Sequence, residues 1–194
     1  TKPAVTNLAP VRALRGLRRL SCGGYYDHRS GKGYRSELTD LAPLRGLDLH
    51  TLYVHFARAS DLSPLEGMRL RSFECYNTPV SDLTPLRSAP LESLKCFYTP
   101  IASLEPLQNA RLQLLEIDHT RISDLAPLKG MPLKNLKCEP SVAQRNQGIL
   151  RAVETLVTIN GQPAAEFWKQ VDAGGIQGAQ AEEWTTLSNG WRVG

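Results

Sequence analysis

The sequence predicts an α/β repeat solenoid, in which short parallel strands stack on one another and tight turns return the chain between them. The first observation is an internal repeat with a period of 21 residues, whose successive copies start at Asp61, Asp82 and Ser103. The second is the apolar spacing L-x-x-L-x-C, which places Leu94 and Cys96 on one face of a short strand. One unit buries too little apolar surface to fold alone, so the units must stack.

Each unit consists of one strand and one tight return, as residues 82–102 illustrate. Side chains alternate along the strand, so Lys95 and Phe97 point away from the core. The return begins at Asp82, whose carboxylate caps the next turn, and Pro85 fits a first turn because that position needs no N–H. Only about seven residues remain before the next turn, so we expect a short 3-10 or irregular turn rather than an α-helix.

The motif L-x-x-L-x-C/V/I-x-x-T-x-I/V-S-D-L-x-P-L resembles the leucine-rich repeat of the short, 21-residue bacterial type. With the closing TINGQPAAEFWK, it is similar to arrays associated with bacterial serine/threonine protein kinases. The resemblance covers roughly residues 1–171 and implies parallel β-strands on a concave face, short 3-10 or irregular turns on a convex face, and a helical C-terminal cap. The family usually has Asn where this chain has Thr78, Thr99 and Thr120, which implies that these hydroxyls bond the backbone of neighbouring coils.

The pattern divides the chain into a leucine-rich repeat array at residues 1–145, a C-terminal cap at 146–173, and a linker and tail at 174–194. The array begins inside a coil, so we expect either a piece of a longer protein or a degenerate first coil. In the cap, Phe167 and Trp168 are expected to cover the end of the core. The tail either opens a following domain, docks on the cap or is disordered.

Eleven extra residues interrupt the array within residues 23–39, a stretch rich in Gly, Tyr and positive charge. Its glycines indicate a flexible loop or a short hairpin. It is not a phosphate-binding P-loop, because Tyr26 stands at the position of the first Gly and Gly33 replaces Ser or Thr. Insertions into solenoid coils carry binding residues or act as solvated spacers, and both remain open for this one.

The net charge of +4 hides an asymmetry along the chain. Residues 1–36 hold eight basic groups against one acid, Asp27, whereas the remainder holds 15 basic and 18 acidic groups. The eight are Lys2, Arg12, Arg15, Arg18, Arg19, Arg29, Lys32 and Arg35. A basic region of this kind offers an alternative function, the binding of a polyanion or nucleic acid, although solvated turns explain it more plainly and nucleic acid is not the partner we expect.

The four cysteines share one inward strand position with Val54 and Ile117; they are Cys22, Cys75, Cys96 and Cys138. Their spacings do not suit a zinc site, and a Cys75–Cys96 bridge would need unusual strand geometry. We therefore expect buried free thiols, which favour a reducing, cytoplasmic compartment. No apolar run reaches membrane-spanning length, and no charged-then-apolar leader follows Thr1, so we expect no membrane insertion of this segment and a signal peptide that is absent or removed.

Aromatic side chains gather on one side of the outward strand face in the middle coils. Apolar rings on a solvated face are typical of an interface, but such rings also pack on one another as a cross-strand ladder. The insert would hang over the same edge. The candidate partner-binding residues are Tyr25, Tyr26, Tyr53, His55, Phe56, Tyr76, Lys95, Phe97, Tyr98 and His119.

The histidines offer no catalytic or metal site. Neither a nucleophile with an orienting base nor a pair of His with a carboxylate ligand accompanies His50, His55 or His119. Asp118 and His119 are adjacent, so in a regular strand their side chains face opposite ways.

We therefore expect a non-catalytic module, monomeric and without cofactor, that recognises a protein or peptide through its concave aromatic face and its Tyr/Gly-rich insert. One alternative is polyanion or nucleic-acid binding through the basic N-terminal region. The other is a regulatory or docking segment of a larger kinase-type protein.

Overall fold

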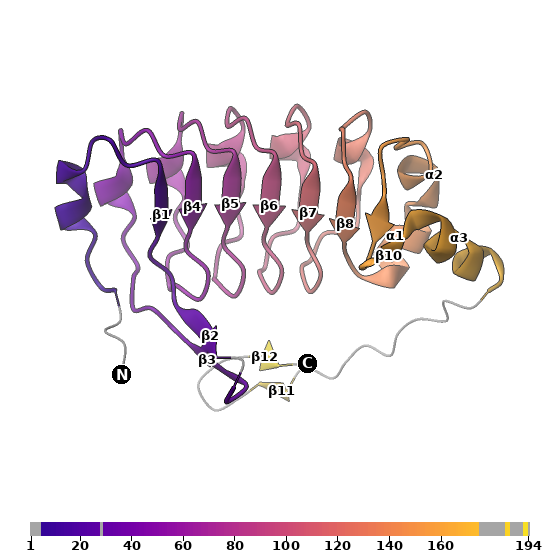
Figure 1. Cartoon of the computed structure of the whole chain (residues 1–194), viewed down its shortest axis with the longest axis horizontal. Helices are drawn as coiled ribbons and strands as arrows, with labels where there is room; N and C mark the ends of the chain where they lie inside the picture. The colour runs from indigo at the N-terminus through magenta and orange to yellow at the C-terminus, as the bar shows by residue number, and fades with distance from the viewer. Residues whose placement is uncertain (1–4, 28, 175–184, 187–191, 194) are drawn as a thin grey trace.

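The computed structural model describes residues 5–27, 29–174, 185–186 and 192–193, and its main body is a solenoid whose strands stand side by side along the long axis (Figure 1). The sheet has the order β1-β4-β5-β6-β7-β8-β9-β10, parallel as far as β9. The repeat strands are β1 (Arg19–Ser21), β4 (Thr51–Tyr53), β5 (Ser72–Glu74), β6 (Ser93–Lys95), β7 (Leu114–Glu116) and β8 (Asn135–Lys137). Equivalent residues of successive coils pair directly, so each strand position of the repeat forms a column across the sheet.

Short 3-10 helices form the returns between strands, as the spacing predicted. They are η1 (Ala9–Ala13), η2 (Ala42–Leu44), η3 (Ser63–Leu65), η4 (Thr84–Leu86), η5 (Glu105–Leu107) and η6 (Ala126–Leu128). The predicted cap at Asp82 is present, because its Oδ1 accepts the Thr84 N–H at 2.8 Å. Polar side chains play the same part in the other coils: Asn7, Asp40, Asp61, Ser103 and Asp124.

The core is a set of inward columns that run the length of the sheet. Leu52, Phe73, Leu94 and Leu115 are each 0% exposed and stack in successive coils. The four cysteines occupy the next inward column, and all are buried and free. Burial raises the pKa of the Cys22 and Cys138 thiols to about 12 and raises those of Cys75 and Cys96 as well. The thiols therefore stay protonated and serve as small apolar side chains.

The threonines do not form the inter-coil ladder that the resemblance implied. The Thr99 hydroxyl donates to the Cys96 carbonyl of its own turn at 2.5 Å, and Thr78 and Thr120 bond in the same way. The reason is reach, since a hydroxyl on Cβ ends one atom sooner than an Asn amide on Cγ. Backbone groups link these turns instead, as the Tyr98 N–H shows by donating to the Asp118 carbonyl at 3.1 Å.

The insert is a β-hairpin, which decides between the two predicted alternatives. Strands β2 (Tyr25–Asp27) and β3 (Lys32–Tyr34) pair antiparallel, with Tyr25 opposite Tyr34. The Asp27 carboxylate closes the turn by accepting the Arg29 N–H and the Ser30 hydroxyl. In Figure 1 the hairpin leaves the edge at which the arrows of the strands end.

A helical cap closes the C-terminal end of the core, as predicted, and its first helix begins at Pro140, before the predicted boundary at residue 146. It contains α1 (Pro140–Arg145), α2 (Gln147–Leu150), the hairpin of β9 (Thr158–Ile159) and β10 (Gln162–Pro163), and α3 (Ala164–Asp172). Phe167 is 1% exposed and Trp168 packs against the core beside it. The Asn146 side chain joins cap to array, because it accepts the Leu125 N–H and donates to the Ser123 carbonyl.

Beyond the cap, β11 (Thr185–Thr186) and β12 (Arg192–Val193) pair antiparallel. The predictions for the tail at 174–194 otherwise fall on residues outside those described. Among the helices that the structure describes, none combines the length and the apolar character that crossing a membrane requires.

Candidate functional site

The outward face carries its aromatic residues where each strand gives way to a turn. The first residue of that turn faces outward in each coil, as His55, Tyr76 and Phe97 do. The residue after it has positive φ, 56° at Phe56 and 54° at Tyr98. This left-handed backbone breaks the strand alternation, so consecutive side chains come together at one edge; the His55 and Phe56 ring centroids lie 6.1 Å apart.

Seven rings contact one another along this edge, and we call them the aromatic ridge: Tyr53, His55, Phe56, Tyr76, Phe97, Tyr98 and His119. Tyr76 stacks on His55 at 4.6 Å and on Phe97 at 4.3 Å, with interplanar angles of 1° and 9°. Tyr98 stacks on His119 at 4.4 Å. The cross-strand ladder considered from the sequence therefore exists. Phe56 is 4% exposed, and the other ridge residues are half-buried.

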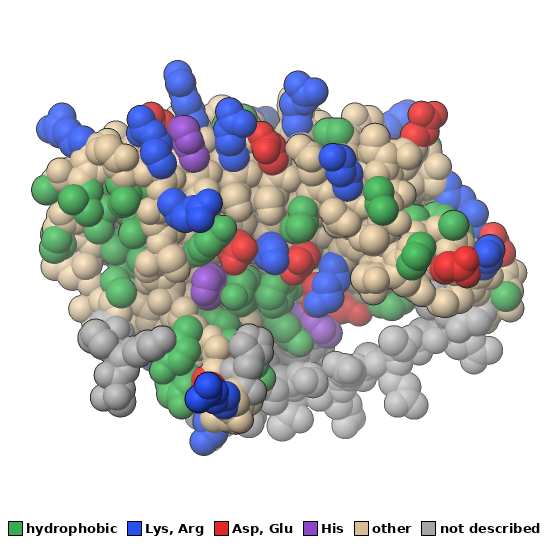
Figure 2. All heavy atoms as spheres, viewed as in Figure 1, with side chains coloured by type: hydrophobic (Ala, Val, Ile, Leu, Met, Phe, Trp, Pro, Cys, Tyr) green, Lys and Arg blue, Asp and Glu red, His purple; other side chains and the backbone are tan. Residues whose placement is uncertain are grey.

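A row of alternating charges runs across the strands beside the ridge. Figure 2 shows acidic and basic side chains alternating above a hydrophobic patch that lies between two histidines. The row consists of Glu74, Lys95, Glu116 and Lys137, which equivalent positions of β5 to β8 provide. Lys95, a candidate binding residue, pairs with the Glu116 carboxylate at 3.2 Å.

Burial sets the protonation of the ridge. It lowers the pKa of His55, whose Nδ1 lies 3.7 Å from Glu74 Oε2, beyond hydrogen-bond range. It raises the pKa of Glu74, an effect that Lys95 opposes and Glu116 reinforces. The pKa of Tyr76 rises to about 12, first through burial and then through the two carboxylates. At neutral pH, His55 is therefore uncharged and Tyr76 keeps its proton.

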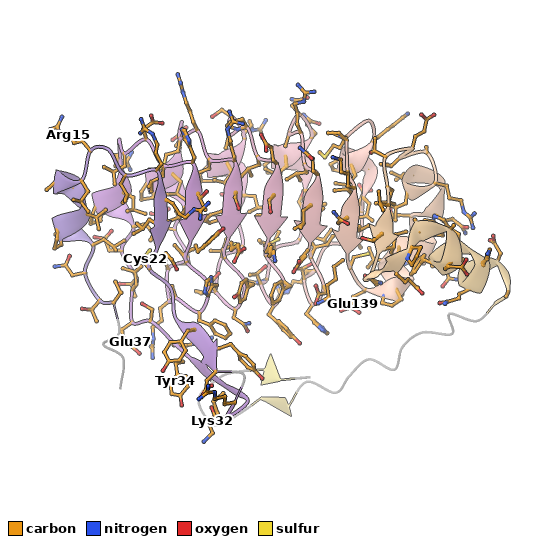
Figure 3. All side chains as sticks on the ribbon, viewed as in Figure 1. Arg15, Cys22, Lys32, Tyr34, Glu37 and Glu139 are labelled. Atoms are coloured by element: carbon orange, nitrogen blue, oxygen red, sulfur yellow. The ribbon has the colours of Figure 1, made fainter. Side chains whose placement is uncertain are left out.

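Asp118 and His119 do not face opposite ways. His119 Nε2 lies 4.0 Å from Asp118 Oδ2, because the pair sits in a turn with φ of +56° at His119 instead of in a regular strand. Glu139 completes the group: its Oε1 accepts the His119 N–H at 3.0 Å and lies 3.2 Å from His119 Nδ1. Figure 3 places Glu139 at this same edge, near the end of β8.

Sequence reasoning left three residues of this group out of the candidate set, namely Asp118, Lys137 and Glu139. Their positions in the outward columns were readable from the repeat. What the columns do not reveal is that Lys137 Nζ lies 3.3 Å from Asp118 Oδ2 and 5.5 Å from the centre of the Phe97 ring.

The hairpin packs against the N-terminal end of the ridge. The Gly24 N–H donates to the His55 carbonyl at 2.7 Å. A Cβ at Gly33 would lie 2.9 Å from Phe56 Cε1, so only glycine allows the hairpin to approach this closely. On the hairpin, Tyr25 stacks on Tyr34 at 4.8 Å, and Tyr26 is 46% exposed. The candidates Tyr25 and Tyr26 thus belong to a neighbouring surface, on which Figure 3 also marks Tyr34.

The basic residues of the N-terminal region lie in more than one place. Arg12 and Arg15, together with Arg45 from outside that region, line a surface hollow of about 530 Å³ at the first coils. Lys32 lies on the hairpin instead, and Figure 3 shows Arg15 and Lys32 at opposite edges of the solenoid. Lys2 is outside the described residues. In the part of the chain that the structure describes, no three His, Cys, Asp or Glu side chains gather in a way that would hold a metal ion.

The comparison with solved structures finds internalins of Listeria monocytogenes. Internalin C2 matches with a TM-score of 0.64 and 23% identity over 79% of this chain and 65% of its own. An internalin F structure (TM-score 0.47, 21% identity, 80% and 64% covered) and the functional domain of InlJ, which includes a cysteine ladder (0.49, 20%, 80% and 36%), also match. No protein-family model and no curated protein sequence matches the chain.

The likeness to internalin C2 shows the fold, a leucine-rich-repeat solenoid, and confirms the predicted fold class. This chain covers less than two thirds of each of these three structures.

Proposed function

We propose that this chain is a non-catalytic recognition module that binds a protein or peptide along the aromatic ridge and the adjoining hairpin. The observation that carries the proposal is the ridge itself, in which rings from four successive coils stand in contact at one edge. Fold likeness to internalins is compatible with such a role. In a longer kinase-type protein, the same surface would dock a partner.

Ring stacking supports this role because it holds the surface in place before a partner arrives. Each stacked pair contributes about 0.5–1.5 kcal/mol beyond burial. Tyr76, stacked on both sides by His55 and Phe97, has little rotamer freedom left to lose on binding. Preordered aromatic side chains are typical of the residues that dominate interface energies.

The backbone beneath the ridge also supports it. Asn tolerates positive φ, and Asn77 occupies this position in one coil. Phe56 and Tyr98 occupy it in others, where a bulky side chain costs about 1 kcal/mol or more. Stability alone favours Gly or Asn here. Packing against the hairpin explains Phe56, whereas the partly exposed Tyr98 is better explained by what the surface binds.

The test uses peptides selected from a random library against the full 194-residue chain. Tyr76→Ala and Phe97→Ala are each expected to weaken the selected peptides by about 2 kcal/mol, roughly thirtyfold, as central interface aromatics do. Isothermal titration calorimetry measures the change, and thermal melting confirms that the variants remain folded.

Val157→Ala is the matched control, because Val157 is an apolar side chain that is 59% exposed and precedes β9, at the opposite end of the strands from the ridge. It should leave affinity unchanged. If a folded Tyr76→Ala, Phe97→Ala double variant binds the peptides as the parent chain does, the ridge is not the binding surface.

A second candidate is the binding of a polyanion at the first coils. The hollow lined by Arg12, Arg15 and Arg45 favours it, since three guanidinium groups and one carboxylate, Asp48, surround the same space. Affinity for heparin that falls steeply with salt, and falls again in Arg12→Gln, Arg15→Gln, would support this function. A salt-independent affinity would exclude it.

A further inference from the structure

The stack of rings in the ridge ends at Phe97. His55, Tyr76 and Phe97 lie nearly parallel, with interplanar angles of 1° and 9°. The next coil places Asp118 at this position, because Lys95 pairs with Glu116 in the sheet register. One face of the Phe97 ring therefore lies on Tyr76, and the coil beyond its other face supplies a carboxylate instead of a ring.

Asp118 is only 8% exposed, yet the fold does not satisfy it fully. Its Oδ1 is buried without a hydrogen-bond partner among the described residues. Its Oδ2 is near two cationic or potentially cationic groups, Lys137 Nζ at 3.3 Å and His119 Nε2 at 4.0 Å. Burying a carboxylate with an unpaired oxygen is unfavourable, so its position indicates a role outside folding.

Lys137 shows which chemistry this site accepts. It belongs to β8, two coils from Phe97, and reaches across Asp118 until its Nζ is 5.5 Å from the centre of the Phe97 ring. A cation over a ring face and beside a carboxylate gains from both. The Lys137 side chain is nevertheless 52% exposed, so water and rotamer entropy compete with this contact and it exchanges easily.

We propose that Phe97 and Asp118 together bind an arginine side chain of the partner at the position that the Lys137 ammonium occupies, and that the partner displaces Lys137 from it. The inference rests on the proposed function, since it names the partner chemistry of the ridge. A planar guanidinium suits the site better than an ammonium, because it stacks on a ring while it bonds a carboxylate.

The charge of the surroundings agrees with a cationic ligand. Glu74 and Glu116 stand in the row beside the ridge, and both help to raise the pKa of Tyr76. Lys95 is held by Glu116 at 3.2 Å, and among the described residues Lys137 places its ammonium over the Phe97 ring. The expected partner is therefore a segment that presents arginine beside apolar side chains.

The experiment titrates the full chain, labelled for NMR, with N-acetyl-arginine amide and with N-acetyl-citrulline amide, its neutral isostere. Arginine is expected to bind more tightly than citrulline by about threefold or more, with the largest shifts at Phe97 and Asp118. Lys137→Met should tighten arginine binding by about two- to fivefold, since it removes the competing cation and keeps the chain length. Asp118→Asn should abolish the preference, whereas Glu66→Gln, an exposed acid on the turn face, should preserve it.

Equal affinity for the two amides would overturn the proposal, and so would a preference that persists in Asp118→Asn. If that variant does not fold, Lys137→Met decides, because its side chain is half exposed. A second outcome would be selected peptides without basic residues, whose affinity falls in Tyr76→Ala but does not change in Asp118→Asn. That outcome would overturn this inference and would leave the proposed function supported. Arginine amide binding at Asp118 combined with peptides indifferent to Tyr76→Ala would defeat the proposed function instead.

Discussion

Leu94 and Lys95 are neighbours in β6, yet the core and the aromatic ridge on either side of them repeat in different ways. The inward column beside Leu94 keeps one kind of side chain through five coils: Val54, Cys75, Cys96, Ile117 and Cys138. The outward column at the end of the same strands changes its chemistry almost coil by coil: His55, Tyr76, Phe97, Asp118 and Glu139. Packing between coils limits the first column to small and medium apolar groups, whereas the second column, at the partly exposed edge of the sheet, accepts both rings and charged groups. Packing therefore explains the inward residues, and the varied outward residues are the ones that we propose for binding.

The largest expected effect tests this comparison at the two neighbours themselves. Leu94 is 0% exposed, so Leu94→Ala should lower the free energy of unfolding by about 2–5 kcal/mol. Lys95→Ala should cost less than about 1 kcal/mol, since it removes only a partly exposed pair with Glu116. Urea denaturation measures both. Comparable losses would show that the two faces share one constraint.

A smaller effect is expected at the returns, where Asp82 accepts hydrogen bonds from Thr84. Asp82→Ala should cost about 0.5–2 kcal/mol, and the exposed Ser81→Ala should cost almost nothing. Hydrogen bonds from the Thr84 side chain and N–H lower the pKa of Asp82, so its contribution is complete above the unfolded pKa near 3.8 and is lost as pH falls through the lower folded pKa. Denaturation at pH 7 and in acid checks both, and a cost that survives full protonation would argue against the carboxylate.

The smallest effect concerns the ridge, where His55 titrates. Burial lowers the pKa of His55 in the folded state, so the unfolded chain binds a proton at His55 at a higher pH than the folded chain does. Stability therefore falls as the pH drops from about 6.5 towards the lower folded pKa. His55→Phe keeps a ring on Tyr76, as Phe97 does, and should flatten the fall between pH 7 and 5. Glu74 Oε2 lies 3.7 Å from His55 Nδ1, so the difference in thermal melting reports the titration of the His55–Glu74 pair. An identical pH dependence would show that the ring is not buried in solution.

Several features of the site depended on reach and backbone angle rather than on pattern. The period of the repeat places Phe97 and Asp118 in one column. Lys137 lies two coils from Phe97, and its ammonium contacts the ring and the Asp118 carboxylate because its side chain is long. The threonines were expected to bond neighbouring coils and bond their own turns, since the hydroxyl is short. The hairpin was one of two predicted forms, and its contact with Phe56 follows from glycines that admit close approach.

By itself, the sequence determined the solenoid, its inward columns, the polar caps of its returns and the aromatic character of one outward edge, because a repeat of 21 residues assigns each side chain to the core or to solvent. Tertiary structure alone decided how the edge is assembled. Positive φ occurs at four different residues, Phe56, Asn77, Tyr98 and His119, so no single residue type in the sequence indicates the left-handed backbone. The positive φ at these positions and the stacking of adjacent coils together bring the rings into contact and place Asp118 beside His119. Such contacts form only when the coils pack against one another.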